Sequence, residues 1–350
     1  MKENSIQNPI YRYKKLIFIF IIILLTVIVA MANSDDIENA LQKFFQIDFL
    51  SVVILIVLLV IHMIADGMLL KIGIDDPHLD HKKAFMINAA GCFFSAITPL
   101  YIGSYPSRIY YLYKENVPID KTLSALTIRG LTYQIVINVL AIASLFLVDG
   151  IKAVAGGYMV FLILGLVYNL GIGSVLILIS ASKRFNELAV RFVKRLALKF
   201  SFINKRKGEV LEAIHNYYEN TRRIYMDRPY FLKIMGLMTL KTVAFYIIPI
   251  VAFMGLRVNI STIWIEVFAI STLIAIIASV FPTPGGMASS EAVFILLYGL
   301  FIMSDSTLQA SMLIWRLFSY YLVVLVGLGA TLFLQTKEPK NITLMRGVKK

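Results

Sequence analysis

Cysteine and charge are both scarce in this sequence of 350 residues. Its one cysteine, Cys92, excludes an internal disulfide. Charged residues make up 16% of the chain, whereas a soluble domain carries about 25%. Long polar segments are missing as well, because the longest one, 182–233, spans only about 50 residues. These absences argue against a soluble protein and leave no stretch long enough for an independent soluble domain.

Apolar residues are abundant and fall into long runs. They make up 59% of the chain, and its mean hydropathy is +0.78. A helix needs about 20 apolar residues to cross a bilayer. Runs of about this length occupy 16–32 (marginally), 49–70, 122–147, 153–180, 234–256 and 310–334, and shorter or interrupted runs cover 84–98, 263–281 and 288–302. The sequence therefore predicts an all-α polytopic membrane protein with about six spanning helices in one integral membrane domain, 1–350.

The distribution of basic residues predicts the orientation. Segment 182–233 holds 13 Lys and Arg against 5 acidic residues, and both ends of the chain are basic, whereas the connection 33–48 is mainly acidic. Since Lys and Arg concentrate in cytoplasmic loops, we expect both termini in the cytoplasm and 33–48 outside. Topology explains the net charge of +13 better than nucleic-acid binding does, because the basic residues flank apolar spans. The run 16–32 also resembles a signal peptide ending at Ala30-Met31-Ala32, and either interpretation places residue 33 outside.

A break in the second half of the chain is the most informative motif. Pro282-Thr283-Pro284-Gly285-Gly286 interrupts an apolar stretch and is followed by Glu291. Prolines and glycines end a helix, and a backbone opened at membrane depth is tolerated only where protein or a water-filled cavity surrounds it. The motif therefore predicts a polar site inside the membrane, at the tip of a hairpin formed by 263–281 and 288–302.

Counting the membrane crossings predicts a second hairpin. With 182–233 in the cytoplasm, segment 84–121 has to start and end on that side, so 84–98 cannot be a simple span. Thr98-Pro99 and the turn Gly103-Ser104-Tyr105-Pro106 supply the break. We expect a re-entrant hairpin from the cytoplasmic side here, and one from the outside at 263–302.

The two halves of the chain share this pattern. Repeat one (about 49–180) and repeat two (about 234–334) each contain a span, a broken hairpin and a span with an arginine near its start, and the basic amphipathic linker 181–233 joins them. The corresponding motifs read Arg129-Gly130-Leu131-Thr132-Tyr133 and Arg316-Leu317-Phe318-Ser319-Tyr320. Because the hairpins enter from opposite sides, we predict an inverted repeat with a transport site where the two tips meet.

Three arginines beside the breaks are candidate substrate-binding residues. Arg129 and Arg316 lie inside their spans, where an arginine is costly and usually faces a partner or a cavity. They are predicted to hold a lipid phosphate as forked donors, with snorkelling to the nearer interface as the alternative. Arg108 lies in the first turn after Pro106 and allows the same two interpretations.

The start of the half-helix after Gly286 supplies the other candidates. Glu291 is either a structural complement to the helix dipole or the partner of an arginine or of a cationic headgroup. Ser289 and Ser290, with the free N–H groups of that helix end, are suited to a phosphate.

Other polar residues in the apolar runs are weaker candidates. Asp66 and His62 share a helix face, and a solvated or paired role for Asp66 is favoured over a proton relay. Lys241 is expected to snorkel. The acidic and histidine residues at 75–81 lack a closed ligand spacing, so we predict no metal site, and we predict no catalytic residue and no cofactor.

Two groups of residues resemble a known family over roughly 50–334. The first comprises Thr98-Pro99, Gly103, Pro106 and Ile109-Tyr110-Tyr111-Leu112-Tyr113-Lys114, and the second comprises Pro282 to Gly286, Glu291-Ala292, Trp315-Arg316 and Ser319-Tyr320-Tyr321. They resemble the flippase-like membrane domain of lysylphosphatidylglycerol synthase, also called multiple peptide resistance factor. Ser104-Tyr105 departs from the Gly-Gln that relatives often carry before the proline, which leaves the headgroup open.

The resemblance implies a function in lipid handling. We expect a protein of the bacterial cytoplasmic membrane that moves an anionic or aminoacylated phospholipid, such as lysylphosphatidylglycerol, between leaflets. Its expected partners are membrane phospholipids and a separate aminoacyl-lipid synthase, without nucleic acid. The alternatives are a lysyltransferase, for which the family uses a soluble acyltransferase domain that we expect this chain to lack, and a scaffold without transport. The sequence leaves open the lipid, the energy source and the oligomeric state.

Overall fold

The structure is a computed structural model that describes residues 37–147, 151–199, 204, 207–302 and 304–336. Regular secondary structure in these residues is helical throughout. The helices of the first half are α2 (Ile37–Phe45), α3 (Phe49–Ile74), α4 (His81–Ala96), α5 (Ser104–Lys114), α6 (Ile119–Leu147) and α7 (Ile151–Ala181). Those that follow are α8 (Lys183–Lys199), α10 (Lys207–Met226), α11 (Arg228–Tyr246), α12 (Ile248–Gly255), α13 (Trp264–Ala278), α14 (Ser289–Tyr298), α15 (Asp305–Arg316), the π-helix η1 (Leu317–Tyr321) and α16 (Leu322–Thr336).

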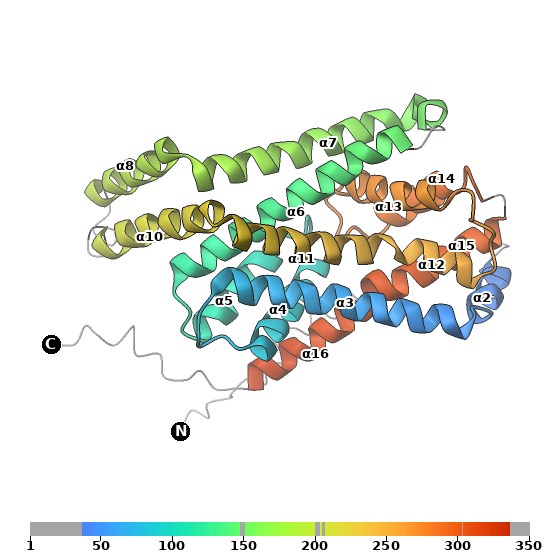
Figure 1. Ribbon diagram of the computed structural model, residues 1–350, viewed down its shortest axis with the longest axis horizontal. Coiled ribbons are helices and arrows are strands. Elements are labelled where there is room, and N and C mark those ends of the chain that lie inside the picture. The colour runs from blue at the N-terminus through green and yellow to red at the C-terminus, as the bar shows by residue number, and fades with distance from the viewer. Residues whose placement is uncertain (1–36, 148–150, 200–203, 205–206, 303, 337–350) are drawn as a thin grey trace, which may run out of the picture.

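Within the described residues, five helical stretches are long and apolar enough to cross a membrane, which confirms the prediction of an all-α polytopic membrane protein. They are Phe49–Ile74, Ile119–Leu147, Met159–Ala181, Arg228–Gly255 and Asp305–Gln335. Figure 1 shows them running roughly along the longest axis of the molecule. The predicted first span at 16–32, together with its signal-peptide alternative, lies outside the described residues.

Capping interactions set the ends of the helices around the first hairpin. The Asp48 carboxylate accepts a hydrogen bond from the Ser51 N–H at 2.9 Å and starts α3. At the other end, Asp75 adopts a left-handed conformation (φ 46°) and donates its N–H to the Lys71 carbonyl at 3.1 Å. The Asp80 carboxylate then caps α4 by accepting the Lys83 N–H at 2.7 Å.

Two of these spans are interrupted, whereas the runs 234–256 and 310–334 were predicted to be continuous. The chain breaks between α11 and α12 at Ile247, two residues before Pro249. Proline has no N–H and its ring clashes with the carbonyl four residues earlier, so α11 cannot continue unchanged. The second interruption is η1, a π-helical turn of 5 residues between α15 and α16. π-Helical turns are rare and often found at functional sites.

The chain forms two helical hairpins whose tips meet. The first hairpin consists of α4 and α5, and the second of α13 and α14. In Figure 1 the first lies toward the end that carries α8 and α10, and the second toward the end that carries α2 and α15. Their tips approach each other at an antiparallel bridge between Pro99 and Pro284.

Each hairpin packs against the opposite half of the chain. Helix α4 packs on α16, and α13 packs on α6, so the first arm of each hairpin contacts the span that follows the other hairpin. The first spans of the two halves, α3 and α11, also pack together. An inverted repeat would produce this exchange of contacts, and the repeat itself stays a prediction.

The basic linker contains helices α8 and α10, and α8 is amphipathic. Helix α8 exposes Phe185, Leu188 and Phe192 between basic residues. Helix α8 packs on α10, which in turn packs on α6. An exposed apolar stripe with basic neighbours is typical of a helix lying at a membrane surface.

Candidate functional site

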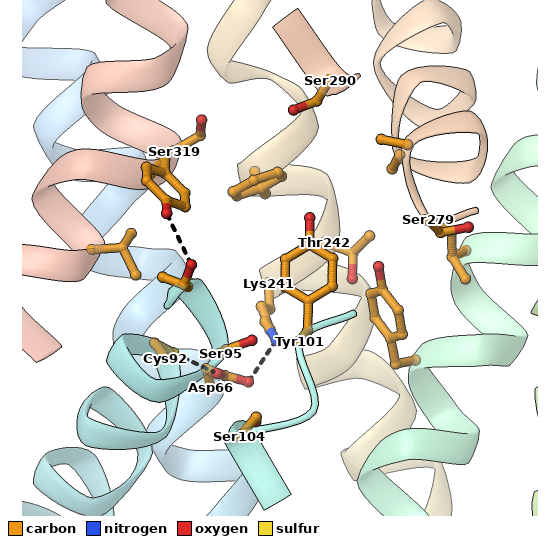
Figure 2. A pocket seen from close by; sticks show the side chains of 18 of the residues that line it. Asp66, Cys92, Ser95, Tyr101, Ser104, Lys241, Thr242, Ser279, Ser290 and Ser319 are labelled. Atoms are coloured by element: carbon orange, nitrogen blue, oxygen red, sulfur yellow. Dashed lines mark hydrogen bonds and ion pairs between the residues drawn. The ribbon is translucent and has the colours of Figure 1, made fainter. Parts of the chain in front are cut away.

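A cavity of about 760 Å³ lies between the two hairpins and the spans around them. In Figure 2, Asp66 and Ser104 border it at one end, Ser290 and Ser319 border it at the other, and Tyr101 stands between them. The acidic and basic side chains in its wall are Asp66, Arg108, Arg129, Lys241, Arg316 and His62. Four cations therefore share this wall with one carboxylate.

Asp66 on α3 is the centre of the first ion-pair cluster. Its side chain is 2% exposed and contacts cations from two other spans. Arg129 on α6 donates from Nη2 to Asp66 Oδ1 and Oδ2, at 2.7 and 2.9 Å. Lys241 Nζ on α11 lies 2.6 Å from Oδ1, a contact that Figure 2 marks. The Asn88 amide donates to Oδ2 at 2.7 Å, so both carboxylate oxygens are fully engaged.

Arg108 reaches this cluster from the first hairpin. Its guanidinium donates to the side-chain oxygen Oδ1 of Asn88 at 3.1 Å and to the Ser104 hydroxyl, and it lies 4.0 Å from Asp66. The side chain passes over Gly91, where a Cβ atom would lie 2.6 Å from Arg108 Nε. Glycine at 91 is therefore required for the close approach of α4 and the Arg108 side chain.

The snorkelling interpretations are wrong for these residues. Lys241 and Arg108 are buried at 9% and 2% exposure, and both contact Asp66 or its neighbours instead of an interface. Arg129 is likewise held by Asp66. A partner on a distant helix makes the buried charge tolerable, and the sequence does not reveal which helices touch. Of the roles expected for Asp66, the structure gives the paired one.

Arg316 and Glu291 form a second cluster beside the tip of the second hairpin. Arg316 Nη2 donates to Glu291 Oε2 at 2.6 Å, to the Gly286 carbonyl at 3.2 Å and to the Ser290 hydroxyl. The guanidinium also lies over the Trp315 ring, 4.7 Å from its centroid. Glu291 thus has the arginine partner that was one of its two predicted roles, and snorkelling is wrong for Arg316 as well.

The tips of both hairpins contain residues in left-handed conformations. Gly285 and Gly286 have φ angles of 56° and 67°, and Leu100 and Tyr101 have φ angles of 52° and 59°. A Cβ atom on Gly286 would overlap the Tyr101 hydroxyl. Non-glycine residues in this region store strain and occur preferentially at functional sites.

Several predicted tip residues hold the backbone in place. The Thr98 hydroxyl donates to the Phe94 carbonyl at 2.7 Å and accepts the Gly103 N–H at 2.9 Å, which closes the first tip. The Ser289 hydroxyl donates to the Gly286 carbonyl at 3.0 Å and contacts Thr283 at 3.1 Å, which closes the second. These hydroxyls therefore have a structural role.

The structure separates the predicted binding residues into two groups. Arg108, Arg129, Arg316 and Ser290 line the cavity, as does the hairpin residue Pro106. Glu291 and Ser289 do not line the cavity. The remaining predicted tip residues, Thr98, Pro99, Gly103, Pro282, Thr283, Pro284, Gly285 and Gly286, are not part of the lining.

Three side chains of the wall have buried polar atoms without a hydrogen-bond partner. They are Arg129 Nε, Arg316 Nε and Ser319 Oγ. Buried donors are normally satisfied, so each such atom calls for an explanation. Ser319 was not predicted as a site residue, although it follows Arg316 by one helical turn and that spacing places both on one face.

Asn88 and Tyr101 were not among the predicted site residues, and Lys241 was expected at the interface. Asn88 in an apolar run was a visible signal, since an amide at membrane depth needs partners. Nothing in the sequence around Tyr101 predicts its place in the cavity wall, because that place depends on a turn with a positive φ angle.

Together, the fold and cavity define a polytopic membrane protein with a buried, cation-rich site between two broken-helix hairpins. The chain belongs to the family described as the lysylphosphatidylglycerol synthase TM region, whose model matches residues 15–327. It is similar to a UPF0104 membrane protein of Methanocaldococcus jannaschii, with 24% identity over 265 residues, which cover 74% of this chain and 77% of that protein. No solved structure matches the chain. The resemblance seen in the sequence is therefore confirmed at the level of the family.

Proposed function

We propose that this protein moves a phospholipid with an anionic headgroup between the two leaflets of the cytoplasmic membrane. The observation that carries the proposal is the cavity wall, in which four cations and one carboxylate lie among apolar spans. Intramembrane ionisable residues are rare and mark substrate or ion pathways.

The guanidinium groups of the cavity wall can offset the loss of hydration that a phosphate suffers when it enters the membrane. A phosphate that enters hydrocarbon loses its hydration, and an uncompensated charge in that environment costs many kcal/mol. Guanidinium groups replace lost water with charge-assisted hydrogen bonds. Arg129 and Arg316 each have an Nε donor that the protein leaves unused.

The orientation follows the basic residues. We place both termini and the helices α8 and α10 in the cytoplasm, because Lys and Arg concentrate there. The first hairpin then opens toward the cytoplasm and the second toward the outside. Translocation would pass the headgroup across the point where their tips meet.

A leaflet-resolved assay in proteoliposomes tests the proposal. Purified protein is reconstituted with a fluorescent phosphatidylglycerol, and the fraction of dye accessible to an external quencher is followed over time. We expect accelerated translocation by the unmodified protein and slow translocation by Arg129→Ala and Arg316→Ala. Arg223→Ala, at an exposed position on α10, serves as control. No acceleration by the unmodified protein would indicate a scaffold, and cavity variants that match an accelerated unmodified rate would indicate that the site is elsewhere.

A further inference from the structure

We propose that the cavity selects a headgroup that carries two negative charges and no amine, which is the chemistry of a lipid phosphomonoester. This inference rests on the proposed function and specifies its substrate class. It departs from an aminoacylated lipid, whose headgroup is cationic.

The charge balance of the wall is the first observation. Arg316 is neutralised by Glu291, one charge against one. Asp66 alone faces Arg108, Arg129 and Lys241, so the first cluster retains two uncompensated positive charges. No other acidic side chain among the described residues lines the cavity. Buried charges require a partner, and a phosphomonoester carries about −1.5 to −2 charges at neutral pH.

The carboxylate in the wall that would bind an amine is already engaged by protein groups. Both oxygens of Asp66 accept hydrogen bonds from protein groups. Glu291 Oε1 has no partner, but Glu291 is not part of the cavity wall. Aromatic faces can also bind ammonium groups, and two of the aromatic rings in the wall, Trp315 and Tyr320, already lie against the Arg316 guanidinium. A cationic headgroup would meet four cations and no available carboxylate.

The unused donors are the second, independent observation. Arg129 Nε, Arg316 Nε and Ser319 Oγ are buried without a partner, and their side chains contribute to the cavity wall. They are spread over both ion-pair clusters, which lie on either side of the hairpin tips. A phosphomonoester offers three strongly accepting oxygens, and a headgroup passing from one cluster to the other meets, at each, a side chain with a polar atom that no protein group uses.

A headgroup series on the unmodified protein tests the inference. Fluorescent lipids with identical acyl chains carry phosphate (phosphatidic acid), phosphoglycerol, phosphoethanolamine or lysyl-phosphoglycerol. We expect phosphatidic acid to move about tenfold faster than phosphatidylglycerol, and the amine-bearing lipids to be slowest, as buried charge pairs of this kind discriminate strongly. Uptake of radiolabelled glycerol phosphate into the same vesicles distinguishes a soluble phosphate from a lipid and should be absent.

Lowering the pH provides a check on the same protein. The second ionisation of a phosphomonoester has a pKa of about 6. The ratio of the translocation rate of phosphatidic acid to that of phosphatidylglycerol should therefore fall toward one as the pH is lowered from about 8 to about 5. An advantage that is independent of pH contradicts selection by charge.

A matched pair of lysines on α11 provides the variant test. Lys241→Met removes one of the two uncompensated charges, and we expect it to shift the preference from phosphatidic acid toward phosphatidylglycerol. Lys233→Met, at an exposed position of the same helix, should leave the preference unchanged. Equal rates for all headgroups, or a preference for lysyl-phosphoglycerol, overturn this inference and leave lipid transport standing. Failure of every lipid to move overturns the proposed function itself.

Discussion

Lys241 on α11 and Asp66 on α3 form an ion pair of 2.6 Å across the interface between the two halves of the chain. The pair is buried, and Arg129 from α6 contacts the same carboxylate. One carboxylate therefore joins three spans at the cavity wall. The stability of this assembly depends on Asp66 more than on any one of its cations, because the cations have no other acidic partner in this cluster.

Replacement of Asp66 should be strongly destabilising. Asp66→Asn leaves Arg129 and Lys241 buried without a counter-charge, and breaking a buried ion pair on one side costs about 3–5 kcal/mol. Thermal unfolding of the detergent-solubilised protein measures the effect. Glu187→Gln, at an exposed position on α8, should change stability by less than about 0.5 kcal/mol. The double variant Asp66→Asn/Lys241→Met should recover part of the loss, since it removes one of the stranded cations.

Arg316→Lys should restore only part of the transport rate that Arg316→Ala loses. A lysine keeps the charge opposite Glu291 but loses the unused Nε donor and the planar contact with Trp315. We expect Arg316→Ala to slow translocation about tenfold or more, with Arg316→Lys between it and the unmodified protein. A lysine variant as fast as the unmodified protein would indicate that only the point charge matters.

Gly286→Ala should distort the tip of the second hairpin. The new methyl group would have to adopt a φ of 67° and would collide with the Tyr101 hydroxyl, so a cost of about 1–3 kcal/mol is expected. Gly236 lies in α11 with nothing within 4 Å of its would-be Cβ atom. Gly236→Ala is therefore the matched control and should stabilise the protein by about 0.5–1 kcal/mol. Similar losses of stability from both variants would contradict the tip geometry.

The contact between the tips can be tested by cross-linking. Opposed residues of an antiparallel bridge have Cα atoms about 4.5–5.5 Å apart, which suits a disulfide. In a Cys92→Ala background, Pro99→Cys/Pro284→Cys should form a disulfide on mild oxidation. If lipid passes between the tips, oxidation should stop transport and reduction should restore it. Each single cysteine variant should be insensitive to oxidant.

The loop between α3 and α4 predicts a pH dependence of stability. Burial raises the pKa of Asp76, but hydrogen bonds from Lys121 and His78 outweigh it and lower this pKa to about 2. A depressed carboxyl pKa stabilises the fold above the unfolded value of about 3.9, and the contribution is lost as the pH falls toward 2. Asp76→Asn should therefore cost about 1–2 kcal/mol at neutral pH and nothing near pH 2. Asp75→Asn, at the exposed neighbouring position, is the control and should change stability at neutral pH by less than about 0.5 kcal/mol.

The fold was largely readable from the sequence, because apolar run length and the placement of proline and glycine are local properties. Both hairpins follow from Pro99 and Pro284 in otherwise apolar stretches. The cavity was only partly readable. Arginines inside spans pointed to Arg129 and Arg316, but the pairing of Arg129 and Lys241 with Asp66 depends on how α3, α6 and α11 pack. Sequence spacing says nothing about that packing, which is why Lys241 was misinterpreted.

The bridge between Pro99 and Pro284 determines which groups hold the two hairpin tips together. Proline lacks an N–H group, so neither of these residues can donate a backbone hydrogen bond to the other. The two tips are fastened by the groups around them, among them the Tyr320 hydroxyl, which donates to the Ala96 carbonyl at 3.1 Å. The contact between Pro99 and Pro284 therefore depends on neighbouring residues, because these two prolines cannot hydrogen-bond to each other through their backbones.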